Sequence, residues 1–81
     1  MIARNENSNI VLEFSEDETI VLLEWLHNFN EQNHTRLFQD QAEERILFDL
    51  EAELEKIISV PFKKNYDQIL SKARKKLRDE E

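Results

Sequence analysis

The chain has no glycine among its 81 residues, and this absence restricts both its turns and its chemistry. Glycine takes left-handed backbone conformations without a steric cost, so phosphate-binding loops, nucleophile elbows and tight oxyanion turns usually depend on it. Asparagine tolerates such a conformation better than most other residues. We therefore expect Asn30 or Asn33 to take the left-handed position after the first helix, and we expect no glycine-based phosphate loop or nucleophile elbow.

The length and composition predict one small globular domain. A content of 40% apolar residues favours a folded chain over disorder, although 36% of the residues are charged. The longest apolar run, residues 20–23, is far shorter than the roughly 20 residues of a membrane span, and the first residues lack the apolar core of a signal peptide. We expect a cytoplasmic protein without membrane association. The absence of cysteine excludes disulfides and Cys-based zinc sites.

A short strand is predicted near the N-terminus. Ile10, Leu12 and Phe14 lie on one side at a period of two residues, which predicts a strand over residues 10–14. Two pairing partners remain open for it: the segment 35–38, and the same strand of a second chain. Residues 1–9 are polar and rich in asparagine, so we expect a flexible N-terminal arm there.

Three helices are predicted after this strand. Ser15 and Glu18 form a capping box that opens the first helix, over residues 16–29. Its apolar side chains cover an arc of roughly 200°, which indicates that the helix is covered on more than one side. Asp40 and Glu43 repeat the capping pattern before a second helix.

The second helix is expected to run to about residue 58, because Pro61 disfavours helical geometry in the residue before it. Asn65 then caps a third helix over residues 66–78. The predicted fold class is mainly α: a short N-terminal β-strand followed by three helices, with helices 2 and 3 as an antiparallel hairpin against the first. This single domain spans residues 10–78, and residues 79–81 form a frayed tail.

The helical core bears on chemistry as well as on stability. If the apolar stripes of three helices are all used in the core, little apolar surface remains to line a pocket. A catalytic carboxyl group needs such a desolvated pocket to shift its pKa. We therefore predict that the protein is not an enzyme and has no cofactor. Two Glu-x-x-His spacings occur, at Glu24 and His27 and at Glu31 and His34, but on one helix the two pairs would lie about 10 Å apart. We predict no metal site.

Charge divides the chain into an acidic body and a basic end. Residues 1–58 carry 14 acidic and 4 basic side chains, whereas residues 59–81 carry 4 acidic and 7 basic ones. An acidic surface favours docking on a basic protein partner. Phe48 lies on the second helix about 160° away from Leu50, so the helical hairpin does not cover it. The predicted partner-binding residues are Glu44, Phe48, Glu51 and Glu55.

Two alternatives to this reading remain open. Lys72, Lys75 and Lys76 of the third helix suggest a nucleic-acid-associated protein, although a net charge of −7 disfavours nucleic acid as a partner. The other alternative is a purely structural homodimer, which the unpaired strand at residues 10–14 would suit.

Several short segments carry a resemblance to known proteins. They are residues 12–18, residues 22–26 with Trp25, residues 50–55, Pro61 with Phe62, and Tyr66, Leu70 and Leu77. Over residues 10–78 the chain resembles small uncharacterised bacterial acidic proteins, which implies a bacterial cytoplasmic setting and no specific chemistry. In size and charge it is also similar to immunity proteins and antitoxins. This similarity implies a non-enzymatic inhibitor that binds another protein.

Overall fold

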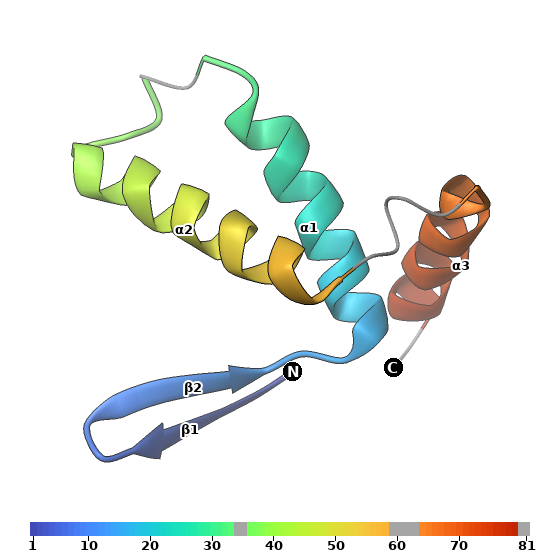
Figure 1. Cartoon of the computed structure of the whole chain (residues 1–81), viewed down its shortest axis with the longest axis horizontal. Helices are drawn as coiled ribbons and strands as arrows, with labels where there is room; N and C mark the ends of the chain where they lie inside the picture. The colour runs from blue at the N-terminus through green and yellow to red at the C-terminus, as the bar shows by residue number, and fades with distance from the viewer. Residues whose placement is uncertain (34–35, 59–63, 80–81) are drawn as a thin grey trace.

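The computed structural model describes residues 1–33, 36–58 and 64–79, and in these residues a β-hairpin precedes three helices (Figure 1). The elements are β1 (Ile2–Glu6), β2 (Asn9–Glu13), α1 (Glu16–Asn30), α2 (Gln41–Ile57) and α3 (Tyr66–Asp79). The predicted mainly α class with a short β part is confirmed. The helix stop at Pro61 and the last two residues of the predicted frayed tail lie outside the described residues. Asp79, the first residue of that tail, is still helical.

The N-terminal segment differs from its prediction. Residues 1–9, expected as a flexible arm, hold β1 and the turn of a hairpin. β1 pairs antiparallel with β2, with Ile2 opposite Glu13 and Glu6 opposite Asn9. Asn7 and Ser8 form the turn with φ of 49° and 73°, and positive φ at both central residues is the geometry that matches the twist of paired strands. The predicted strand therefore exists, but β1 is its partner.

The hairpin lies apart from the helices in Figure 1. On one of its faces, Arg4 forms ion pairs with Glu6 and Glu13. The opposite face carries Ile10 and Leu12, and both side chains are exposed. An ion pair of 3.0 Å joins the amino group of Met1 to Glu18 of α1. The hairpin thus covers little of the helical core.

The first helix begins as predicted. The Ser15 hydroxyl accepts a hydrogen bond from the Glu18 amide at 3.1 Å, and the Glu18 carboxylate accepts one from the Ser15 amide at 2.8 Å. The end of α1 is different from the prediction, because its capping residue Glu31 is right-handed, with a φ of −80°. Among the described residues, positive φ occurs at the hairpin turn and at neither Asn30 nor Asn33.

α1 is the central helix, with α2 packed on it from one direction and α3 from another (Figure 1). Its N-terminal half contacts α3, where Ile20 packs against Leu70 and Ala73. Its C-terminal half contacts α2, where Asn30 donates hydrogen bonds to α2. The predicted antiparallel hairpin of helices 2 and 3 is therefore wrong. The apolar arc of α1 is wide enough for two helices to pack on different parts of it.

The core is small. Its buried apolar side chains in the described part of the chain are Ile20, Leu23, Leu26, Leu70 and Ala73. α2 contributes no buried side chain: the inner positions of its stripe are half-buried, while Ile46 and Ile57 are 64% and 79% exposed. The expectation that the apolar stripes of all three helices are used in the core is thus wrong for α2. A helix packed on one neighbour covers only part of its apolar side.

The helices α1, α2 and α3 all fall short of the combination of length and apolar character that crossing a bilayer demands.

Candidate functional site

The second helix begins with a shifted version of the predicted cap. The Asp40 carboxylate accepts a hydrogen bond from the Ala42 amide at 2.8 Å, as an N-cap residue does. Glu43 reaches back one residue further than in a capping box, because its carboxylate accepts from the Gln39 amide at 2.7 Å. These bonds fix the first turn of α2, which leads directly to the predicted partner-binding residues.

Glu44 and Phe48 lie one helical turn apart on α2 and share one shallow surface hollow. The hollow is lined by Asp40, Gln41, Ala42, Glu44, Arg45 and Phe48. The Phe48 side chain is 43% exposed, and Glu44 is exposed as well. The structure thus brings together two of the four predicted residues, an aromatic ring and a carboxylate, on a face that the described part of the chain leaves open.

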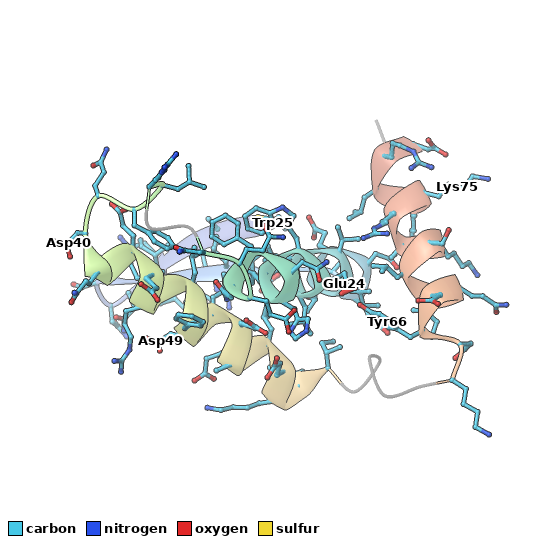
Figure 2. All side chains as sticks on the ribbon, turned by 90° about the horizontal axis from the view of Figure 1, so that it is seen from above. Glu24, Trp25, Asp40, Asp49, Tyr66 and Lys75 are labelled. Carbon is cyan, nitrogen blue, oxygen red and sulfur yellow. The ribbon has the colours of Figure 1, made fainter. Side chains whose placement is uncertain are left out.

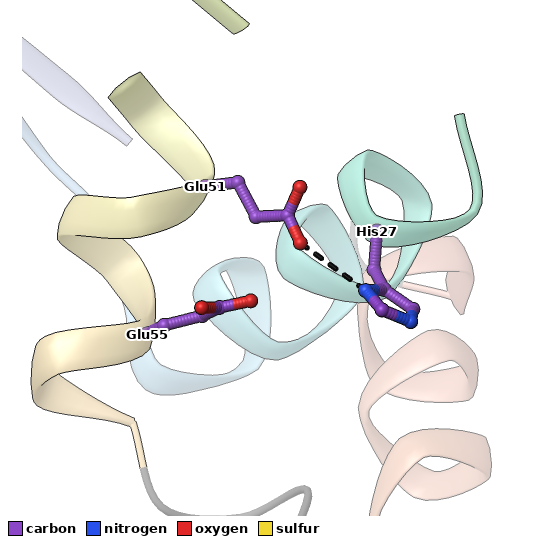
Figure 3. A group of neighbouring side chains, drawn as sticks. All are labelled: His27, Glu51 and Glu55. Atoms are coloured by element: carbon purple, nitrogen blue, oxygen red, sulfur yellow. Dashed lines mark hydrogen bonds and ion pairs between the residues drawn. The ribbon is translucent and has the colours of Figure 1, made fainter. Parts of the chain in front are cut away.

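The other two predicted residues belong to a different environment. Glu51 is half-buried between α1 and α2 and accepts a hydrogen bond from the Asn30 amide group at 2.7 Å. Its second carboxylate oxygen lies 3.2 Å from Nδ1 of His27 (Figure 3). Glu55 is exposed one turn further along α2 and is hydrogen-bonded to Glu51. Glu51 therefore contacts α1, whereas Glu44 and Phe48 lie exposed on the same flank of α2.

The contacts among His27, Glu51 and Glu55 shift the pKa values of all three side chains. The hydrogen bond with Glu51 raises the pKa of His27 above its usual value. Burial alone would raise the pKa of Glu51, but the hydrogen bonds from Asn30 and His27 outweigh this effect and leave the pKa lowered. The pKa of Glu55 is raised, chiefly by its hydrogen bond with Glu51. A cation between the two carboxylates would relieve their mutual repulsion.

The grouping of His27 with Glu51 and Glu55 was not predictable from the sequence, because it joins residues of two different helices. In the two Glu-x-x-His spacings, for which no metal site was predicted, His34 lies outside the described residues and Glu24 is hydrogen-bonded to Tyr66 of α3. The available signal was the pair Glu51 and Glu55, four residues apart and hence on one side of α2. That signal did not indicate which residue of the first helix would face the pair.

The lysines of the alternative nucleic-acid site lie on α3. Lys72, Lys75 and Lys76 are exposed and line a shallow hollow together with Asp79. The ammonium group of Lys76 is 3.1 Å from the carboxylate of Asp17 on α1. Figure 2 shows Lys75 at the opposite end of the molecule from Asp40 and Asp49, so the acidic and basic helices are separated in space.

Comparisons of the chain with protein-family models, with curated proteins and with solved structures give no match.

Proposed function

We propose that the protein is a non-enzymatic interaction protein that docks a basic protein partner on the exposed flank of α2 that carries Glu44 and Phe48. One observation carries this proposal: a helix of 17 residues has no buried side chain, yet it exposes Ile46, Phe48 and Ile57. Most of the stability of a helix in a protein comes from packing of its apolar face. Ile46 and Ile57 lie on the flank of α2 opposite to Phe48. A partner that covers Phe48 would therefore supply part of the packing that the described part of the chain does not.

The charge of α2 supports a basic partner. The helix carries six acidic and two basic side chains. Such a surface speeds the approach of a positively charged protein and disfavours acidic competitors. Phe48 is the proposed anchor, because aromatic side chains dominate binding energy where they fill a pocket of the partner. An inhibitor of the immunity or antitoxin type is the specific form that we propose for this function.

A second candidate is nucleic-acid association through α3. The grouping of Lys72, Lys75 and Lys76 around one hollow favours it. The engagement of Lys76 with Asp17 and the net charge of −7 weaken it. A mobility-shift experiment at low salt separates the two candidates, since binding through three lysines would weaken steeply as salt is added.

The proposal is tested by placing a photo-crosslinking amino acid at position 48, with the same substitution at position 75 as a control. We expect illumination in living cells to join position 48 to one basic protein, and position 75 to join it weakly or not at all. Equal products at both positions, or none at position 48, would contradict the proposal. A product of twice the mass of the chain would indicate the homodimer instead.

The captured protein is then purified and its affinity measured. We expect Phe48→Ser to weaken binding about 30-fold or more, as truncation of a central aromatic anchor does. Glu44→Gln should weaken binding less and reduce its salt dependence. Both side chains are exposed, so the melting temperature should stay close to that of the unaltered protein. A large fall in melting temperature for Phe48→Ser would place Phe48 in the core and contradict its role as an anchor.

A further inference from the structure

Three donor groups of the kind that bind metals meet between α1 and α2. One ligand atom each from His27, Glu51 and Glu55 lies within 4.8 Å of the others (Figure 3). In a tetrahedral zinc site, bonds of 2.0–2.2 Å place neighbouring ligand atoms about 3.4 Å apart. Nδ1 of His27 and the nearer oxygen of Glu51 are already 3.2 Å apart. Glu55 is exposed, so a rotation of its side chain would close the remaining distance.

Two residues outside this group hold its members in a suitable orientation. A histidine that binds a metal usually has its other ring nitrogen bound to a carboxylate or carbonyl oxygen. Here Nε2 of His27 is 3.1 Å from the Glu31 carboxylate, which leaves Nδ1 directed at Glu51. Asn30 holds the second oxygen of Glu51 at 2.7 Å. Both contacts are of the kind that the outer shell of a protein metal site provides.

Charge also favours a dication at this place. Three carboxylates, from Glu31, Glu51 and Glu55, lie near the His27 imidazole. Glu51 and Glu55 are four residues apart on one helix, where two like charges destabilise each other. α2 carries one lysine, Lys56, which pairs with Glu53 at 2.9 Å. His27 relieves part of this repulsion, and a metal ion between Glu51 and Glu55 would relieve more of it because it carries two positive charges.

We propose that His27, Glu51 and Glu55 form a binding site for a divalent transition-metal ion, with Zn²⁺ as the preferred occupant. One imidazole and two carboxylates make a mixed nitrogen and oxygen donor set, which suits Zn²⁺ better than Mg²⁺ or Ca²⁺, whose sites consist of oxygen ligands. Three protein ligands leave a fourth position for water. The ion would join α1 to α2, so it would stabilise the packing of a helix that has no buried side chain.

The test is a calorimetric titration of the full chain with Zn²⁺. We expect one ion per chain, and at least a 10-fold weaker affinity for each of His27→Gln, Glu51→Gln and Glu55→Gln. Glu53→Gln is the matched control: it removes one carboxylate from the same helix, and Glu53 is outside the proposed ligand set. Mg²⁺ at the same concentration should not compete. Absence of zinc binding by the unaltered chain would overturn the proposal.

Two further measurements separate a built site from diffuse attraction to an acidic surface. If Glu53→Gln lowers the affinity for Zn²⁺ as much as Glu55→Gln does, the ion is attracted by the overall negative charge of the surface, and the proposal is wrong. The visible spectrum of the chain loaded with Co²⁺ should show the strong absorption of a four-coordinate ion, and Glu55→Gln should remove it. Glu55 is exposed, so this variant should fold even if Glu51→Gln does not. Crosslinking at position 48 is independent of these results, so either proposal can fail alone.

Discussion

At Tyr66, two influences act on the same hydroxyl group. Burial first, and then the neighbouring Glu24 carboxylate, to which the hydroxyl is hydrogen-bonded, raise the pKa of Tyr66 to about 12, from an ordinary value of 10.0. Both influences favour the neutral phenol in the folded chain. The unfolded chain ionises at lower pH, so the contribution of Tyr66 is fully present below pH 10 and is lost as the pH rises to about 12.

We therefore expect the free energy of unfolding to fall between about pH 10 and pH 12, as measured by urea denaturation followed by circular dichroism. Tyr66→Phe has no phenol to ionise and should show a flatter profile over the same interval. Lysines also titrate in this range, so the difference between the two profiles is the relevant quantity. Identical profiles would mean that the Tyr66 hydroxyl is not shielded by α1.

Residue-level prediction succeeded where the decisive contacts lie within a few positions of each other. The Ser15 and Glu18 cap was correct because both of its bonds span three residues. The hairpin turn at Asn7 and Ser8 was missed for a related reason. Asn-Gly is the strong signal for a turn with two left-handed residues, and this chain has no glycine to provide it.

At the scale of elements, the hairpin is the part least connected to the rest. A two-stranded sheet alone is marginally stable in water, and this one exposes Ile10 and Leu12 instead of packing them on a helix. An ion pair between the Met1 amino group and Glu18 joins it to α1. The hairpin should therefore contribute little to the stability of the three helices.

A chain that starts at residue 14 should accordingly keep the helical circular dichroism signal and unfold cooperatively, with a melting temperature within a few degrees of the full chain. Its matched comparison is a full chain with Arg4→Ala, in which the ion pairs to Glu6 and Glu13 are lost but both strands remain. A truncated chain without cooperative unfolding would show that the hairpin covers part of the core.

The helices themselves could be predicted to within about two residues, because caps and apolar periodicity are local properties. Their arrangement could not. The predicted hairpin of α2 and α3 would have placed their opposite charges side by side. Exposed ion pairs contribute little, however, and both helices pack on α1 instead. For the same reason the joining of His27 to Glu51 was not predictable: it depends on which helix faces which.

For the whole molecule, the size of the core sets how much change the fold tolerates. A protein of this length has a free energy of unfolding of roughly 4 to 12 kcal/mol, at 0.05–0.15 kcal/mol per residue. In the described residues five apolar side chains are buried, and one of these is alanine. Because α2 adds no buried side chain, each of the buried leucine and isoleucine side chains contributes an unusually large part of the stability.

Leu26 is the critical position, since only 1% of its side chain is exposed. Leu26→Ala removes buried apolar surface and leaves a cavity, so we expect a loss of about 2 to 5 kcal/mol in the free energy of unfolding, measured by urea denaturation. Leu12→Ala is the matched control on the hairpin, where the side chain is 51% exposed, and it should change the value by less than about 1 kcal/mol. Equal losses for the two variants would contradict the division between a small helical core and an uncovered hairpin. A Leu26→Ala chain that unfolds at 25 °C but regains its helical signal with Zn²⁺ would in addition show that the metal joins α1 to α2.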